Sequence, residues 1–133
     1  MVAKSTIFGL IAALTIILIV VSMTGDDSTK YVKTIGTVYE SGFSQSCVDS
    51  GCYTPNVAHV KTGGTITMKN TDPTGVHTFT SGTVDGFAPQ PNGIFDSGVL
   101  MSGNAFKHKF SQNGTYDYYC MLHTWMTGKI IVS

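Results

Sequence analysis

The feature that most constrains this chain is a run near the C-terminus in which three potential metal ligands follow one another at equal spacing. Cys120, His123 and Met126 are separated by intervals of three residues. The run Gly114-Thr-Tyr-Asp-Tyr-Tyr before the cysteine is typical of a strand, and Lys129–Val132 predicts another strand after the methionine. A loop of this length between two strands can wrap a thiolate, an imidazole and a thioether around one ion. These soft or borderline donors suit copper and disfavour magnesium or calcium.

A trigonal copper site with one thiolate and two imidazoles needs a second histidine from elsewhere in the fold. His77 follows the turn-like segment Asp72-Pro-Thr-Gly and begins a strand-like run, which makes it the natural candidate. His59 lies within a short predicted strand, and His108 alternates with phenylalanines on another, so both are expected to be packing or surface residues.

We therefore predict His77, Cys120 and His123 as equatorial metal ligands, with Met126 as the weak axial ligand. Zinc also binds one cysteine and two histidines, but its preference for a regular tetrahedron makes methionine an unusual fourth ligand. For copper, a trigonal site with a long methionine bond suits both Cu(I) and Cu(II), so little rearrangement accompanies electron transfer. One mononuclear type 1 copper ion is the predicted cofactor.

Most of the chain after residue 43 consists of short strand-like runs separated by turn signals. Fifteen glycines and many Thr, Val, Tyr and Phe residues favour strands and turns over helices. We expect an all-β sandwich in which the long segment from residue 82 to residue 93 acts as a break. The predicted strands are Val57–Val60, Thr65–Asn70, His77–Thr80, Phe95–Leu100, Ala105–Phe110, Thr115–Cys120 and Lys129–Val132.

The N-terminal region predicts a membrane-directing segment. Ile7 to Met23 is a run of 17 residues without a charge. Its length is at the lower limit for a transmembrane helix and above that of a usual signal-peptide core, so both interpretations stay open, and a buried helix is a third. An uncleaved anchor is favoured, because no Ala-x-Ala cleavage signal follows the run. The expected organisation is an anchor or signal segment over residues 1–24, a polar tether over 25–42 and one domain over 43–133.

Two further cysteines, Cys47 and Cys52, lie in a short polar loop and are predicted to form a disulfide. A second metal site is the alternative, but only His59 is nearby as a further ligand. A disulfide indicates an oxidising compartment, which would place the domain on the extracytoplasmic side of the cell membrane. Cys120 then remains as an unpaired thiol, which a metal ion would explain.

The charge balance argues against a polyanionic partner. Charged residues make up only 12% of the chain, and eight basic residues balance eight acidic ones. We therefore expect no binding to nucleic acid. The length of 133 residues leaves room for one compact domain and a tail.

Several segments, in order along the chain, resemble the type 1 blue copper proteins (cupredoxins), particularly small archaeal plastocyanin-like proteins with an amicyanin-type ligand loop. The resemblance implies a Greek-key β-sandwich and the ligand set already predicted. Many relatives have proline beside the second histidine, where this chain has Leu122 and Thr124. Many also have asparagine after the first histidine, where this chain has Thr78, whose hydroxyl is expected to bond across to the ligand loop. The matching segments are Cys47 and Cys52 followed by Pro55, then residues 63–70, 77–82, 93–98 and 114–129.

Together these features predict a one-electron carrier rather than an enzyme, tethered at the outer face of the membrane as a monomeric soluble domain. Its partners would be redox proteins of an electron-transport chain, which would dock on an apolar patch around His123. Two alternatives stay open: small-molecule redox chemistry, such as nitric oxide oxidation at a transiently open copper, and copper storage or delivery. The predicted patch contains Met121, Leu122, Trp125 and Phe87.

Overall fold

A computed structural model describes residues 30–133. The predicted membrane segment, residues 1–24, lies outside the described residues. Within residues 30–133, no helix has the length and apolar character needed to cross a membrane.

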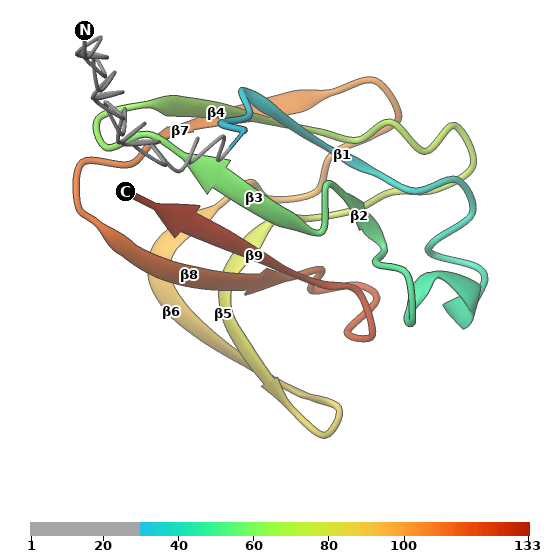
Figure 1. Ribbon diagram of the computed structural model, residues 1–133. Coiled ribbons are helices and arrows are strands. Elements are labelled where there is room, and N and C mark those ends of the chain that lie inside the picture. The colour runs from blue at the N-terminus through green and yellow to red at the C-terminus, as the bar shows by residue number, and fades with distance from the viewer. Residues whose placement is uncertain (1–29) are drawn as a thin grey trace, which may run out of the picture.

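The described chain forms two β-sheets (Figure 1). One has four strands in the order β2-β1-β4-β7, and the other has five in the order β3-β9-β8-β5-β6. The elements are β1 (Thr34–Thr37), the short 3-10 helix η1 (Gln45–Cys47), β2 (Tyr53–Thr54), β3 (Val57–Val60), β4 (Thr65–Lys69), β5 (Thr80–Asp85), β6 (Ala88–Asp96), β7 (Ala105–Lys109), β8 (Gly114–Tyr119) and β9 (Thr127–Val132). The predicted all-β sandwich is confirmed.

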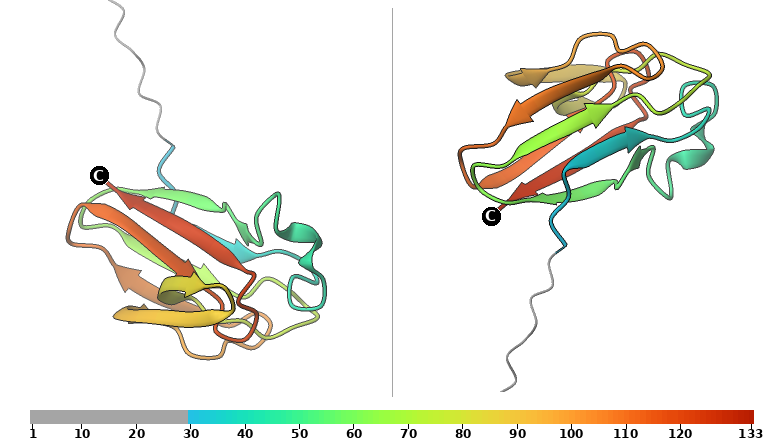
Figure 2. Two further views of the ribbon diagram at one scale, coloured as in Figure 1. Left: turned by 90° about the horizontal axis from the view of Figure 1, so that it is seen from below. Right: turned by 90° about the horizontal axis from the view of Figure 1, so that it is seen from above.

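The two sheets pack face to face (Figure 2) and enclose one apolar core. From the four-stranded sheet, Ile35, Ile66 and Met68 are fully buried. Tyr53 of the same sheet packs across the core, and its ring lies 4.8 Å from that of Tyr118 in β8 of the five-stranded sheet. Because side chains alternate between the two faces of a strand, each strand contributes about every second residue to this core.

The alternation predicted around His108 is found in β7. Phe106 and His108 pair in register with the buried residues Met68 and Ile66 of β4, while Lys107 is exposed. The ring of His108 lies 4.7 Å from that of Phe110. His108 is therefore a packing residue, as expected, and does not lie at the candidate metal site.

The expected tether over residues 25–42 needs a correction in its C-terminal half. Thr34–Thr37 is strand β1, which pairs in parallel with β4 and antiparallel with β2 inside the four-stranded sheet. The sequence signal is weak, because the strand has only four residues and includes a glycine. Its stability comes from pairing with distant strands, which local propensity does not record.

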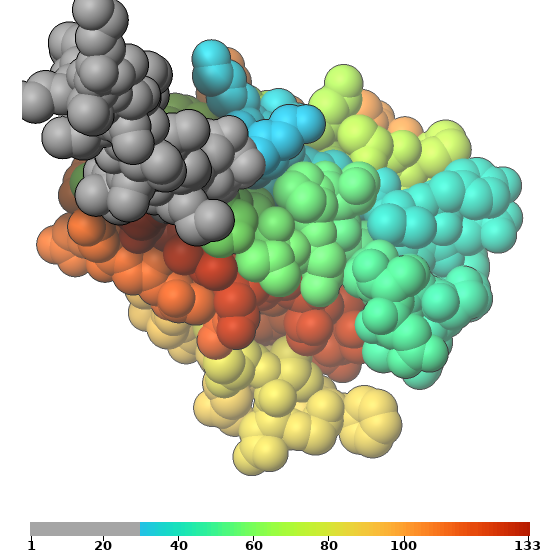
Figure 3. Space-filling view, viewed as in Figure 1, coloured from blue at the N-terminus to red at the C-terminus, as the bar shows by residue number. Residues whose placement is uncertain are grey.

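The predicted break over residues 82–93 is also wrong, because these residues form most of the β5–β6 hairpin. The hairpin protrudes from the body of the molecule (Figure 3). Gly82 has φ +133°, and a side chain there would collide with the carbonyl oxygen of Gln90 in β6. Gly82 suggests a loop in the sequence, but in the structure it permits close pairing of β5 and β6.

Candidate metal centre

Three potential ligands converge at one end of the sandwich. His77 lies between β4 and β5 and is fixed by two backbone hydrogen bonds with Leu100, of 3.2 and 2.8 Å. Cys120 directly follows β8, and His123 lies in the loop to β9. The potential ligand atoms of these three residues all lie within 4.8 Å of one another. Nδ1 of His123 is 3.6 Å from Sγ of Cys120.

The ligand loop, residues 120–126, closes on itself. The amide of Cys120 donates to the carbonyl of Met126 at 3.0 Å, and the amide of Met126 donates to the carbonyl of His123 at 2.9 Å. The Met126 side chain is fully buried and belongs to the same apolar cluster as Cys120. The structure therefore places Met126 beneath the loop, and its role as axial ligand stays a prediction.

Thr78 ties the segment of the first histidine to the ligand loop. Its amide donates to Sγ of Cys120 at 3.4 Å. Its hydroxyl Oγ1 accepts a hydrogen bond of 2.8 Å from the amide of Met121. The predicted bond from the Thr78 hydroxyl to the ligand loop is confirmed.

Asp72 orients the ring of His77. Nε2 of His77 donates to Oδ2 of Asp72 at 2.8 Å, and both side chains are fully buried. Oδ1 of Asp72 accepts bonds from the amides of Glu40 and Thr74 and from the Thr74 hydroxyl. With its proton on Nε2, the ring presents an unprotonated Nδ1.

The Nδ1 atom of His77 is buried and has no hydrogen-bond partner in the structure. A buried polar atom without a partner is costly, and a metal ion would satisfy it. A carboxylate bonded to the distal nitrogen of a histidine is also the usual support for a metal-binding imidazole. The donor set of two imidazoles and a thiol, with this support, fits copper.

The electrostatics of the site favour a thiolate. Burial alone would raise the pKa of Cys120, but the neighbouring His77 and the amides of Thr78, Leu122 and His123 lower it below its ordinary value. Burial lowers the pKa of His123, and the positive charge of a protonated His77 lowers it further. Thiolate and neutral imidazole are the forms that bind metals.

The pKa values of His77 and Asp72 move apart. Burial opposes the charged form of His77, but the neighbouring Cys120 and the bond to Asp72 raise its pKa above the ordinary value. Burial also opposes the charge of Asp72, yet its bonds from Thr74, His77 and Glu40 lower its pKa to about 2. Asp72 is therefore ionised at neutral pH.

The loop after β1 covers the two imidazoles, and this was not predicted. A Cβ atom on Gly42 would lie 2.8 Å from Cε1 of His123 and 3.2 Å from Cε1 of His77. Nε1 of Trp125 donates to the carbonyl of Ser41 at 2.9 Å, which links this loop to the ligand loop. Neither Asp72 nor Gly42 belongs to a recognisable motif, so sequence reasoning missed both.

Cys47 and Cys52 are joined by a disulfide in the structure. The bond closes the segment that begins at η1 and ends just before β2. His59 is in β3 and bridges to Tyr31, so it does not join the two cysteines in a metal site. The alternative of a second metal site at these cysteines finds no support among the described residues.

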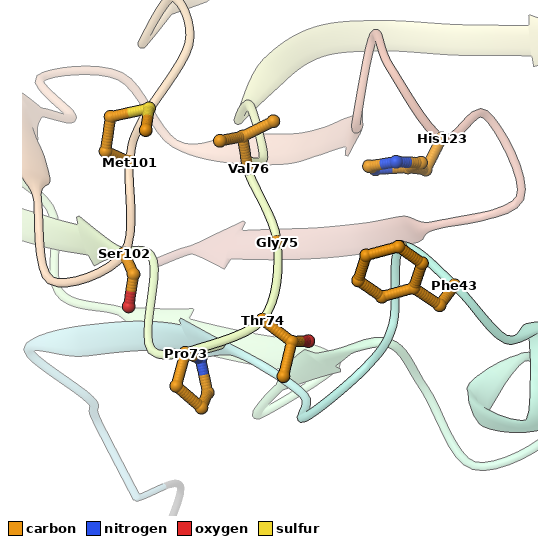
Figure 4. A pocket seen from close by; sticks show the side chains of 9 residues that line it. Phe43, Pro73, Thr74, Gly75, Val76, Met101, Ser102 and His123 are labelled. Carbon is orange, nitrogen blue, oxygen red and sulfur yellow. The ribbon is translucent and has the colours of Figure 1, made fainter.

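A hollow of about 420 Å³ opens beside His123 (Figure 4). Its most exposed apolar members are Phe43 and Met101, which are 76% and 58% exposed. Leu122, in the ligand loop, is also exposed. An apolar surface thus surrounds His123, the one predicted ligand that is not fully buried. The hollow is lined by Gly42, Phe43, Pro73, Thr74, Gly75, Val76, Met101, Ser102 and His123.

Comparison with known proteins agrees with this geometry. The model of the cupredoxin-like domain family matches residues 11–132. Amicyanin-alpha from Methylorubrum extorquens is 37% identical over 81 residues, which cover 59% of this chain and 61% of that protein. Amicyanin from Paracoccus denitrificans is 31% identical over 104 residues, which cover 70% of this chain and 74% of that protein. The chain thus spans less than two thirds of the first of these relatives.

Two solved structures extend the comparison. A novel purple cupredoxin from Nitrosopumilus maritimus aligns with a TM-score of 0.61 and 28% identity, over 77% of this chain and all of that one. A copper-containing nitrite reductase from Thermus scotoductus aligns with a TM-score of 0.53 and 26% identity, over 75% of this chain and 22% of that one. From the family match, the two-sheet sandwich and the buried His, Cys, His group, the chain belongs to the cupredoxin-like family and is a type 1 blue copper protein.

Proposed function

We propose that this cupredoxin is a one-electron carrier whose copper ion is held by His77, Cys120 and His123, with Met126 as the axial ligand. The observation that carries the proposal is that the potential ligand atoms of His77, Cys120 and His123 all lie within 4.8 Å of one another. A copper ion held there would supply the one-electron chemistry by cycling between Cu(I) and Cu(II). The name amicyanin, borne by relatives of this chain, agrees with such a role.

The surroundings of the ligands favour fast electron transfer, because hydrogen bonds hold the ligand residues in place. Asp72 holds the ring of His77. Thr78 bonds to Cys120 and to Met121 on the ligand loop. The Cys120–Met126 backbone bond closes that loop. Preorganised ligands leave little to rearrange when the charge of the metal changes.

The same arrangement argues against catalysis on a small molecule. Such chemistry would require an open position at the metal, and the side chain that would have to withdraw, Met126, is fully buried. Asp72, the carboxylate beside His77, is already occupied by four hydrogen bonds and is not free to act as an acid or base.

The partners proposed for the carrier are redox proteins that dock at the His123 end. His123 is partly exposed, and Phe43, Met101 and Leu122 supply exposed apolar surface around it. Transient redox complexes bury small interfaces, which an apolar patch of this kind can provide. Phe87 of the predicted patch is 89% exposed and lies at the turn of the β5–β6 hairpin.

We further propose that the domain is tethered at the outer face of the cell membrane. The 17-residue uncharged run, Ile7–Met23, supports the tether. The disulfide supports the oxidising side.

The proposal is tested by loading the protein with one equivalent of Cu(II) and recording its visible spectrum and redox titration. A carrier should show strong thiolate-to-copper absorption and a reversible one-electron titration. Cys120→Ser should abolish the colour, whereas His59→Gln, a matched change away from the site, should preserve it. A colourless Cu(II) form of the wild-type protein would refute the site.

Two further measurements separate the alternatives. Excess nitric oxide, with dissolved oxygen as the terminal oxidant, should reduce the copper of a carrier once and leave it reduced, whereas sustained consumption of nitric oxide would indicate catalysis. A Cu(I) chelator should remove the metal slowly from a carrier and rapidly from a storage or delivery protein.

A further inference from the structure

The charged side chains are unevenly distributed between the two ends of the sandwich. Four exposed lysines, Lys30, Lys33, Lys61 and Lys109, lie at the end opposite the ligand loop, and we call this group the basic end. The segments that build this end contain no aspartate or glutamate: residues 30–34, 60–66, 107–114 and 130–133. At the ligand end, two acidic residues lie close together, because the backbone amide of Glu40 donates to Oδ1 of Asp72.

The lysines of the basic end are brought together by strand pairing. The carbonyl of Lys33 accepts a bond of 2.9 Å from Thr67 of β4, and Lys109 of β7 is the register partner of Thr65. The carbonyl of Lys61 accepts a bond of 2.8 Å from Gly64 in the β3–β4 turn. Neither Lys33, Lys61 nor Lys109 forms a salt bridge with any described residue.

A second hollow, of about 250 Å³, lies among these lysines. Tyr31, on its rim, is 48% exposed. Tyrosine is enriched at membrane–water interfaces, where its amphipathic ring lies at the level of the lipid headgroups. The hollow is lined by Tyr31, Val32, Lys33, Val60, Lys61, Gly64 and Thr65.

The basic end and the ligand loop are separated by the length of the strands. Figure 1 shows the start of β1 and the C-terminus at one end of the sandwich and the β8–β9 loop at the other. Strand β8 runs from Gly114 to Tyr119, next to Cys120, which at about 3.3 Å per residue is roughly 20 Å. A surface that contacts the basic end therefore leaves the copper site facing away.

The chain enters the basic end at Lys30. Seven peptide units separate it from Met23, the last residue of the uncharged run, so the two are at most about 25 Å apart. If that run is inserted in a membrane, the lysines are held close to the lipid headgroups. Lysines near an anionic membrane surface are attracted to it within a Debye length, about 8 Å at physiological salt.

We infer that the basic end is a docking surface for an anionic lipid membrane, which holds the copper site pointing away from the bilayer toward soluble partners. This inference rests on the proposed membrane tether. It adds a preferred orientation, which a tether alone does not impose. The occupant is a lipid surface, because the chain leads from Lys30 to the uncharged run within seven residues, and Lys33 and Lys61 line one hollow next to Tyr31.

The test uses the full copper-loaded chain in vesicles of phosphatidylcholine alone or mixed with phosphatidylglycerol. A membrane-impermeant acetylating reagent modifies exposed lysines, and mass spectrometry gives the rate at each one. Lys33, Lys61 and Lys109 should react several-fold more slowly in the anionic vesicles, and 1 M salt should restore their rates because it shortens the Debye length to about 3 Å. Lys69, at the opposite end of β4 from Thr65, and Lys129, the register partner of Asp117 in β8, serve as internal controls and should change much less.

Equal rates in the two kinds of vesicle would overturn the inference. Equal protection of Lys69 and Lys109 would also overturn it, because the domain would then lie flat rather than on its end. Extraction with alkaline carbonate tests the tether separately. If carbonate releases the protein, the tether is refuted, whereas salt-reversible protection of the three lysines would still support the lipid-binding surface.

Discussion

Replacing Asp72 with asparagine should reverse the protonation of the His77 ring. Asp72 accepts the Nε2 proton of His77 through Oδ2 and three further hydrogen bonds through Oδ1. In Asp72→Asn, the amide oxygen can keep the bonds from Glu40 and Thr74, so the amide nitrogen faces His77. Because that nitrogen donates, the ring must accept at Nε2 and carry its proton on Nδ1, the atom predicted to bind copper.

Two magnitudes follow from this geometry. Loss of an outer partner of a metal-binding histidine typically lowers metal affinity about 10- to 100-fold. In the metal-free protein, the pKa of Asp72 is lowered from 3.8 to about 2, which corresponds to about 2 kcal/mol of folding free energy. A lowered folded-state pKa contributes stability above the unfolded pKa and loses it as the pH falls through the folded value. The contribution is therefore complete above about pH 5 and lost toward pH 2.

The first assay is competition for Cu(I) with a coloured chelator, which gives the affinity ratio between the wild-type protein and Asp72→Asn. The second is urea unfolding of both metal-free proteins at pH 6 and at pH 2.5. The wild-type protein should be more stable by about 2 kcal/mol at pH 6, and the difference should shrink at pH 2.5.

The control is Asp117→Asn, which removes an exposed carboxylate 3.8 Å from Lys129. It should change neither copper affinity nor the pH dependence of stability. If Asp72→Asn binds Cu(I) as tightly as the wild-type protein and shows the same stability difference at both pH values, the Asp72–His77 bond does not orient the ligand and the reasoning is refuted.

Three further predictions concern other parts of the site. Gly42→Ala should displace the ring of His123, because its methyl group would lie 2.8 Å from Cε1; a changed visible spectrum of the copper form would show this, and an unchanged one would contradict it. Met126→Leu should retain copper and shift the reduction potential, so an unchanged potential in a redox titration would argue against an axial Met126. Replacing both Cys47 and Cys52 with serine should lower the free energy of unfolding in urea by about 2 kcal/mol, the loop-closure value for a short ring, and should leave the copper spectrum intact; a lost spectrum would show that the disulfide shapes the site.

The candidate site was accessible from the sequence because three of its four predicted ligand residues are concentrated in one loop. Cys120, His123 and Met126 lie within seven consecutive residues, and their spacing carries the chemistry without knowledge of the fold. The role of Thr78 was also predicted, since it adjoins His77 and bonds to the ligand loop. Sequence patterns identify these residues because the potential ligands lie close together along the chain.

The supporting residues could not be found in this way. Gly42 matters only because β1 and the loop after it bring it against two imidazoles that are 35 and 81 positions away in the sequence. Asp72 first suggests a turn residue before Pro73, and only the folded chain shows that its carboxylate also holds His77. Both roles depend on contacts between distant segments, which composition and periodicity do not record.

The same reason explains which strands were missed. Strand β1 has only four residues, and β2 has two, so neither shows a full alternation. Strand β6 carries Pro89 and Pro91, which suggest a break, but it lies at the edge of its sheet, where proline is tolerated. Edge position is a property of the whole sheet and is not visible in the strand itself.

The backbone bond between Cys120 and Met126 has a consequence for how such a protein can evolve. Next to this bond, Tyr119 and Thr127 are the last register partners of β8 and β9. The ligand loop therefore begins where the pairing of the β8–β9 hairpin ends, and the Cys120–Met126 bond closes it. Residues inserted or exchanged within the loop would alter the environment of the copper without disturbing the sheet. Natural variation can therefore retune the redox chemistry on an unchanged scaffold.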